Sequence, residues 1–420
     1  MRGQCPINAS TVGRSSGCCR RTSVRLDSVR ASHAAVMPRR EQTMGVDLDA
    51  INHATRVVLD AVHPVRYAHY ITPTNLTQVR TEFLDAHRAG RAVDPRFEYP
   101  PIPGELAAAL DAARAAPTEA GPWREALERE LAYARAGLAA LHSRDPEAMT
   151  SYSQSQFGDV AAAVVVDAYR RLGEQPPTAD TEATWNSDRV AATMGRVLVE
   201  LGLDEWTVDH SDRMAARMSV VGRRRQVRVK RGVTFTGPTV QRLIVHEIGT
   251  HVLRTANGLR QPLHLLAHGI PGYLGTEEGL AVWHEQQAGM IDPDVMRRYA
   301  LRVIACDTAL RAGFRAVFDA VLPHTTTNEA FDLALRVKRG LIDTSAPGGY
   351  IKDHIYLGGF IEVTNHLDRH PGDHDLLMAC KWPLSEVPLL RTLFDERSSM
   401  SPHHRVDEVV DLTRAIVAEG

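Results

Sequence analysis

The stretch VHEIGTH, residues 245–251, decides how the fold of this chain is interpreted. It contains two histidines with a glutamate directly after the first, and the stretch TEEGLA, residues 276–281, adds two more glutamates downstream. A hydrolytic zinc site takes three protein ligands and leaves a fourth position for water. The sequence therefore predicts His246, His251 and Glu278 as the ligands of one zinc ion.

The spacing of the two histidines requires a local departure from regular helix. The common zinc-peptidase motif has its histidines at i and i+4, whereas His246 and His251 stand at i and i+5. On a regular helix that spacing separates two side chains by about 140° around the axis. A single π-type turn would return both to one face, and Gly249 lies where such an irregularity meets least steric resistance. We therefore expect a helix with a π turn inside the motif.

Glu247 and two competing histidine pairs bear on this prediction. Glu247 directly follows the first histidine of the motif, a place that suits a general base. The pairs His264 with His268 and His366 with His370 show the simpler i, i+4 spacing, but neither has an adjacent acid or a matching downstream Glu-Gly. For the two histidines alone, a structural role as buried, hydrogen-bonded side chains is as good an explanation as a metal site. With the glutamates, the pattern favours a metal site.

The segments around the motif predict the fold class. Gly237-Pro238 would end a strand, so the motif helix is expected to begin with Thr239 as its N-cap. Residues 214–221 and 226–229 flank residues 222–225 as a β-hairpin, whose edge could hold an extended peptide. Most of the remaining chain shows apolar residues at helical spacing. We expect a mainly helical α+β fold, zincin-like, with a small antiparallel sheet beside the zinc-ligand helix.

The composition is that of an ordinary globular protein. Of 420 residues, 44% are hydrophobic and 24% are charged, and the net charge of −2 gives no general attraction to nucleic acid or membrane. No run of residues approaches the roughly 18 apolar residues of a membrane span. Outside the N-terminal region only Cys306 and Cys380 occur, which excludes a disulfide framework. A reducing, cytoplasmic location is expected.

The first 43 residues differ from the rest of the chain. They contain eight arginines against two acidic residues and show no hydrophobic periodicity, which predicts a disordered leader. An organellar transit peptide is one alternative, and an over-extended start, with Met37 or Met44 as the true beginning, is favoured. Residues 44–420 are expected to form the catalytic domain, with a helical part to about 204 and a zinc-site part from about 205.

The motifs resemble the family of the microtubule-associated tyrosine carboxypeptidase, whose bacterial relatives are labelled tyrosine/phenylalanine carboxypeptidase domain proteins or flavohaemoglobin expression-modulating QEGLA-motif proteins. The family motif is His-Glu-x-x-x-His, and its third ligand is the Glu before Gly-Leu-Ala, here Glu278. One departure is Glu277 in place of the expected Gln, which adds negative charge but removes no ligand. The matching stretches are HEIGTH (246–251), TEEGLA (276–281), RGLIDTS (339–345) and KDHIYL (352–357).

The resemblance implies a zinc metallocarboxypeptidase that removes a C-terminal aromatic residue from a peptide or protein. Such an enzyme needs a cation for the terminal carboxylate, and the candidates are Arg254, Arg336, Arg339 and Lys352. Tyr356 could donate a hydrogen bond to the developing oxyanion. The sequence does not choose among the cations, and the resemblance does not carry tubulin over as the substrate.

The alternative function is a regulatory or binding protein that retains the metallopeptidase fold. The intact Glu247 argues against it, because holding a metal ion requires no general base. Nucleic-acid binding through the arginine-rich leader lacks any accompanying recognition motif. The sequence therefore favours an enzyme that acts on the C-terminus of a peptide or protein.

Overall fold

The computed structural model describes residues 47–174, 184–212, 214, 216–395 and 402–418. All of them belong to the unit His33–Gly420. The predictions for the leader, residues 1–43, therefore lie outside the described residues. Within the described part of the chain, no helix combines the length and the apolar character needed to cross a bilayer. These residues fold mainly into helices with two small sheets, so the predicted mainly helical α+β class is confirmed.

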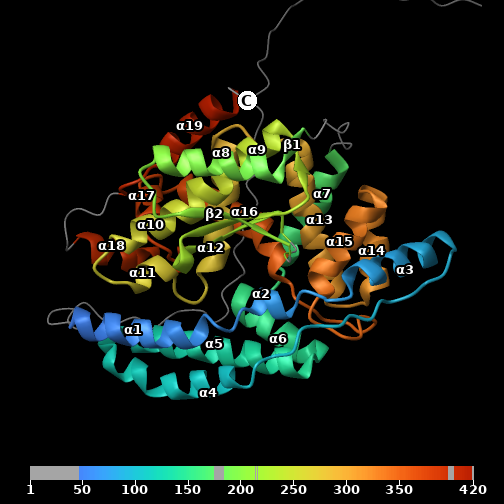
Figure 1. Cartoon of the computed structure of the whole chain (residues 1–420), viewed down its shortest axis with the longest axis horizontal. Helices are drawn as coiled ribbons and strands as arrows, with labels where there is room; N and C mark the ends of the chain where they lie inside the picture. Colours follow the sequence, from blue (N-terminus) through green and yellow to red (C-terminus); the bar gives the residue numbers. More distant parts are fainter. Residues whose placement is uncertain (1–46, 175–183, 213, 215, 396–401, 419–420) are drawn as a thin grey trace, which may run out of the picture. The chain divides into compact units, whose positions relative to one another are not determined.

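The N-terminal helices form a layer in which α1, α4 and α5 lie side by side (Figure 1). Asp47 caps α1 by accepting hydrogen bonds from two backbone N–H groups of the first turn. Ile51, Ala54 and Val58 then fall on one face of α1 and are buried against the layer. The elements are α1 (Leu48–Val62), α2 (Tyr67–Tyr70), α3 (Leu76–Arg88), α4 (Glu105–Ala112), η2 (Ala113–Glu119), η3 (Gly121–Trp123), α5 (Arg124–Ser143) and α6 (Pro146–Phe157).

A three-stranded sheet lies between the N-terminal layer and the motif helix in the sequence. The predicted hairpin is confirmed, because β3 (Met218–Val221) pairs antiparallel with β4 (Gln226–Lys230) around η4 (Gly222–Arg224). The prediction of an antiparallel sheet is correct for β3 and β4 but wrong for the sheet as a whole, because β2 (Thr207–Ser211) pairs parallel with β4. The strand order β2-β4-β3 gives the reason: β4 lies between the two earlier strands and pairs with both of them, antiparallel with β3 and parallel with β2.

Two helices and a short antiparallel pair of strands flank this sheet in the sequence. The helices α7 (Ala162–Glu174) and α8 (Ser187–Glu200) precede it. The strands β1 (Trp185–Asn186) and β5 (Thr234–Phe235) pair with each other. Strand β5 leads directly into the helix that carries the two histidines.

The motif helix is continuous and contains the predicted π turn. It consists of α9 (Gly237–His246), the π-helical segment η5 (Glu247–Val252) and α10 (Leu253–Leu259). The predicted start is wrong: Thr236 is the N-cap, and its Oγ1 accepts from the backbone N–H of Thr239 at 3.2 Å. Pro238 therefore lies in the first turn, where its missing N–H removes no helical hydrogen bond.

The remaining helices complete the fold around α12. Helices α12 and α16 cross with their backbones in contact, because a methyl group built on Gly279 would collide with the backbone of Gly359, and one on Gly359 with the carbonyl of Gly275. The elements are α11 (Leu265–His268), α12 (Tyr273–Gln287), α13 (Pro293–Ala309), α14 (Phe314–Val321), η6 (Leu322–His324), α15 (Thr327–Lys338), η7 (Lys352–His354), α16 (Ile355–Leu367), α17 (Asp373–Met378), η8 (Leu384–Glu386), α18 (Val387–Asp395) and α19 (Val406–Ala418).

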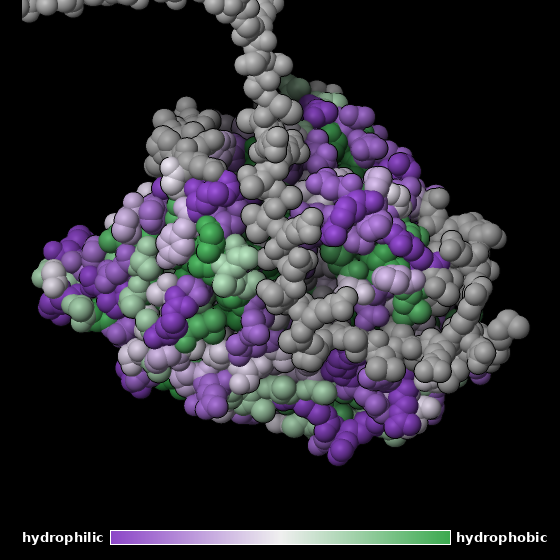
Figure 2. Space-filling view, turned by 180° about the vertical axis from the view of Figure 1, so that it is seen from behind, coloured by the Kyte–Doolittle hydropathy of each residue, from purple (hydrophilic) through white to green (hydrophobic). Residues whose placement is uncertain are grey.

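Apolar packing determines which way the motif helix faces. Ile248 and Val252 of η5 belong to the same buried cluster as Val227 and Val229 of β4. This apolar face points to the sheet, so the polar residues of the same helix face α12. On the surface view of Figure 2, hydrophilic residues surround smaller hydrophobic patches, as expected when most apolar side chains lie in interior clusters.

Candidate metal centre

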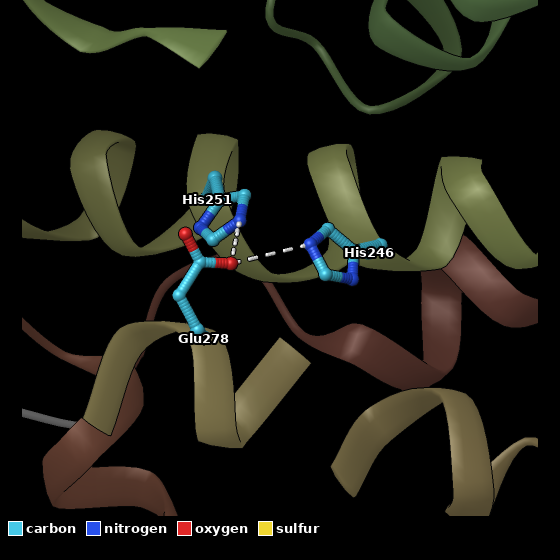
Figure 3. A group of neighbouring side chains, drawn as sticks. All are labelled: His246, His251 and Glu278. Atoms are coloured by element: carbon cyan, nitrogen blue, oxygen red, sulfur yellow. Dashed lines mark ion pairs between the residues drawn. The ribbon is translucent and has the colours of Figure 1, made fainter. Parts of the chain in front are cut away.

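Three predicted ligands meet between the motif helix and α12 (Figure 3). Glu278 Oε2 lies 3.6 Å from His246 Nε2 and 3.7 Å from His251 Nε2. One ligand atom from each residue lies within 4.8 Å of the other two, and within the described residues this is the one such group of three. The π turn is responsible, because it places two histidines at i, i+5 on one helix face.

The donor set fits a divalent metal ion. Glu278 Oε2 is buried and has no hydrogen-bond partner among the described residues, although it faces two imidazole nitrogens just beyond hydrogen-bond distance. Glu278 Oε1 is held by Lys352 Nζ at 3.0 Å, so Lys352 fixes this carboxylate at the site. An unpartnered buried carboxylate oxygen is costly, and two imidazoles with one carboxylate are a common donor set for catalytic zinc.

The far nitrogen of His246 is held by Glu285, one of the residues missed in the sequence. His246 Nδ1 donates to Glu285 Oε1 at 2.7 Å, since a carboxylate can only accept. Glu285 is fully buried and also accepts from Arg242 at 2.7 Å and Tyr299 at 3.2 Å. These contacts leave Nε2 as the nitrogen of His246 that faces Glu278. Glu285 stands seven residues after Glu278, two helical turns along the same face, and that spacing was a usable signal.

The far nitrogen of His251 is held in the same way by Glu277. His251 Nδ1 donates to Glu277 Oε1 at 2.8 Å, and Lys381 Nζ donates to the same oxygen at 2.9 Å. Arg254 pairs with Glu277 Oε2 and donates to the carbonyls of Leu377 at 2.9 Å and Trp382 at 3.3 Å. Arg254 is fully buried. The extra negative charge of Glu277 is therefore offset by two buried cations, one of which, Lys381, had no signal in the sequence.

The charges at the centre keep its carboxylates ionised. Burial opposes ionisation of Glu278, but Lys352 and the two histidines hold its pKa well below the usual range. Burial likewise opposes ionisation of Glu277, but Lys381 and Arg254 lower its pKa. Burial disfavours a charged His246, yet Glu278 and Glu285 raise its pKa to about 10. A metal ion that binds here therefore displaces a proton from the histidine.

Glu247 and Tyr356 lie beside the three ligands. Glu247 is buried, and within the described residues its carboxylate has no hydrogen bond or ion pair. The ring of Tyr356 stacks on that of His246 at a centroid distance of 6.3 Å and on that of Tyr299 at 5.6 Å. Burial raises the pKa of Tyr356 to about 12, so its phenol remains a hydrogen-bond donor at neutral pH.

The four predicted cations have four different environments. Lys352 holds Glu278, and Arg254 lies behind the centre with Glu277. Arg336 forms a two-point ion pair with buried Asp353. Arg339 is buried, its Nε has no hydrogen-bond partner among the described residues, and its guanidinium lies 5.2 Å from the centroid of the Tyr350 ring. The structure thus brings Lys352 and Tyr356 to the ligands and leaves Arg339 as the least satisfied cation.

The loop after Arg339 is held in place from both sides. Lys338 is fully buried and its Nζ donates to three backbone carbonyls, of Ala309, Ala346 and Gly348, at 2.7–3.1 Å. Tyr99 accepts from Gly340 N at 2.7 Å and donates to the carbonyl of Leu341 at 2.9 Å. Arg339 therefore precedes a segment with a fixed backbone.

The competing histidine pairs gather no third ligand within the described residues. His366 instead pairs with Asp373 at 2.7 Å. The centroid of the His268 ring lies 5.6 Å from that of His63, the residue that follows α1. These histidines therefore have the hydrogen-bonded or packed environments expected of structural residues.

Comparisons with known proteins agree with the resemblance in the motifs. A family model described as microtubule-associated tyrosine carboxypeptidase matches residues 81–417. Microtubule-associated tyrosine carboxypeptidase 1 of Mus musculus is 33% identical over 171 residues, covering 39% of this chain and 36% of that protein. The Homo sapiens protein of the same name is 35% identical over 129 residues, covering 30% and 27%. Putative tyrosine carboxypeptidase MATCAP2 of Homo sapiens is 32% identical over 171 residues, covering 39% and 32%. The matched stretch spans about a third of the length of these relatives.

Proposed function

Because the chain belongs to the microtubule-associated tyrosine carboxypeptidase family, we propose that it is a zinc-dependent carboxypeptidase that removes an aromatic residue from the C-terminus of a peptide or protein. The observation that carries the proposal is the buried, unpartnered Glu278 Oε2 facing the Nε2 atoms of His246 and His251. A zincin-like arrangement, with both histidines on one helix, is part of the proposal. The names of the curated relatives support the carboxypeptidase assignment.

The residues around the centre would share the work of hydrolysis. A bound zinc ion supplies Lewis acidity and acidifies a water molecule. Glu247 would accept the proton of the attacking water and pass it to the leaving amine, as a general base and then acid. The Tyr356 phenol would donate a hydrogen bond to the oxyanion that develops on the scissile carbonyl. Glu285 and Lys352 keep the ligands oriented while this occurs.

The same proposal assigns the substrate carboxylate to Arg339. A terminal carboxylate is best held by charge-assisted hydrogen bonds, and those of a guanidinium can be bidentate. Arg336 and Arg254 already have carboxylate partners, of Asp353 and Glu277, whereas Arg339 Nε has none among the described residues. The rings of Tyr350 and Tyr67, which stack at 5.5 Å, would contact an aromatic substrate residue held at Arg339.

The edge of the three-stranded sheet would hold the rest of an extended substrate. Strand β3 is an edge strand within the described residues and packs on the π-helical segment η5. An edge strand offers unpaired backbone groups, which can pair with an extended peptide. The substrate main chain would then run beside the ligand histidines.

The alternative function, a regulatory or binding protein with this fold, has less support. The carboxylate of Glu247 has no hydrogen bond or ion pair among the described residues, so the fold gives it no structural task, whereas hydrolysis requires a base beside the metal ligands. The predicted cytoplasmic location stays a prediction. Cys306 and Cys380, both buried and free, are compatible with it.

Metal analysis and three peptides test the proposal. We expect about one zinc per purified chain, and loss of the terminal residue from a peptide that ends in Tyr with a free carboxylate. The same peptide amidated at its end, and a third that ends in Ala, are the controls and should be cleaved far more slowly. A metal-free wild-type protein, or equal cleavage of the free and amidated peptides, would reject the zinc carboxypeptidase.

A further inference from the structure

We infer that Glu277 is a positioning residue that sets the metal affinity of His251 and that Lys381 weakens this effect. The inference rests on the proposed metal centre and concerns buried side chains on the Nδ1 side of His251. Glu277 lies one residue before the ligand Glu278, on the side of α12 that faces the end of η5. Its role is to hold an imidazole in one orientation and one tautomer.

The contacts of Glu277 are complete and entirely interior. One carboxylate oxygen, Oε1, accepts from His251 Nδ1 at 2.8 Å and from Lys381 Nζ at 2.9 Å. The other, Oε2, pairs with Arg254. All four side chains are at most 11% exposed. A carboxylate with three buried donors has one geometry available, so the ring of His251 has one as well.

A carboxylate on Nδ1 changes what Nε2 offers to a metal ion. The hydrogen on Nδ1 is fixed by the acceptor, so Nε2 carries the lone pair and points toward Glu278 Oε2. The negative charge also makes the imidazole a stronger donor, and loss of such a partner typically weakens metal binding about 10–100-fold. A glutamine at position 277 would still accept from Nδ1, but its amide would face the cationic Arg254.

The carboxylate partners of the two histidines differ in the cation that shares the bonded oxygen: an arginine at Glu285 and a lysine at Glu277. Glu285 Oε1 accepts from both His246 and Arg242, and Arg242 also donates to the hydroxyl of Tyr299. Glu277 Oε1 accepts from both His251 and Lys381, and the Lys381 Nζ atom lies 5.8 Å from the centroid of the Tyr273 ring. The ammonium draws electron density from the oxygen that polarises His251. Removal of this ammonium should therefore strengthen the effect of Glu277 rather than weaken it.

The test uses the full chain and three variants: Glu277→Gln, Lys381→Met and the double variant. Zinc affinity is measured by competition with a chromophoric chelator, and cobalt substitution reports the ligand field in the visible spectrum. Thermal unfolding in EDTA reports folding without metal. We expect zinc to bind about 10–100-fold more weakly to Glu277→Gln, and to Lys381→Met with wild-type or higher affinity.

The double variant separates positioning from folding. It restores the charge balance lost in Glu277→Gln, so its unfolding temperature in EDTA should approach that of the wild type, while its zinc affinity stays low. Wild-type affinity in Glu277→Gln would overturn the inference, as would equal weakening in Glu277→Gln and Lys381→Met. A wild-type protein that binds no zinc would refute the proposed function itself, a result distinct from either of these.

Discussion

Two regions of the molecule, both rich in charged side chains, use them in opposite ways. In the ligand cluster, His246, His251 and Glu278, each side chain is held by one partner and leaves one atom facing a common point. In the cation segment, residues 336–356, most cationic side chains form ion pairs or hydrogen bonds within the protein, and Arg339 is the exception. The first arrangement is typical of a metal centre and the second of a scaffold. The difference shows that a cluster of like charges does not by itself identify a binding site.

The largest effect is expected from a pair of variants in and beside the ligand cluster. His251→Ala removes one of three ligands, so bound zinc should fall well below one per chain and activity should be lost. Glu247→Gln leaves the ligands intact, so it should keep its zinc while its turnover falls by about 10²–10⁴-fold. Elemental analysis and peptide hydrolysis on the same samples measure both quantities. Unchanged zinc in His251→Ala, or near-normal turnover in Glu247→Gln, would remove that residue from its assigned role.

The cation segment is tested by replacing each of two nearby arginines with methionine. Arg336→Met would leave Asp353 buried without its partner, which should lower the free energy of unfolding by about 3–5 kcal/mol. Arg339→Met should leave stability nearly unchanged, since Arg339 Nε has no hydrogen bond among the described residues. It should instead reduce kcat/KM for a free C-terminus by an amount equal to about 1.5–3 kcal/mol.

Urea unfolding and peptide kinetics on both variants measure this contrast. Cleavage of the amidated peptide is the control, because it has no terminal carboxylate to lose. A stable Arg336→Met variant would contradict the structural role of Arg336. A fully active Arg339→Met variant would contradict the binding of the substrate carboxylate by Arg339.

The smallest effect concerns a histidine pair in neither region, which joins the N-terminal layer to α11. Burial lowers the pKa of His63, beside α1, and of His268, in α11, to about 4 each. Below their ordinary pKa of 6.5 the unfolded chain therefore binds more protons than the folded chain, so the free energy of unfolding should fall as the pH drops from 6.5 toward 4. The pair should account for roughly 1–2 kcal/mol of that fall at pH 5, allowing for partial exposure.

Urea unfolding of the wild type and of a His63→Gln/His268→Gln variant at pH 7 and pH 5 measures the effect. The variant should lose less stability than the wild type over this interval. Equal losses in the two proteins would place the acid sensitivity elsewhere. Because the pair lies outside the ligand cluster, its removal should leave zinc content unchanged, which separates folding from metal binding.

The sequence predicted the parts of the molecule that depend on local spacing. The i, i+5 histidines required a π turn, and η5 supplies it. The hairpin of β3 and β4 followed from alternation around a turn, whereas the parallel partner β2 depends on a tertiary pairing that no local pattern encodes. The helix start was misplaced because Pro238 was interpreted as a break, although proline also suits a first turn.

The candidate site divides in the same way. The three residues of the ligand cluster lie on one helix and one downstream motif, so their meeting in the fold could be predicted from spacing. The partners of Arg254 could not be predicted, because they come from distant segments that meet only in the folded chain: Glu277, Leu377 and Trp382. Which of the four cations could bind a substrate carboxylate therefore depends on which of them already has a carboxylate partner in the folded chain.

The glycine crossing of α12 and α16 has a consequence for the energetics of the site. Gly275 and Gly279 of α12 meet Gly359 of α16 with no side chain between the backbones. Glu278 and Tyr356 extend from these two helices within a turn of the crossing. Side chains at an ordinary helix contact can shift rotamers, but two touching backbones have no such freedom. The relative position of Glu278 and the Tyr356 phenol is therefore set by the two backbones, which would keep the reorganisation energy low in the proposed reaction.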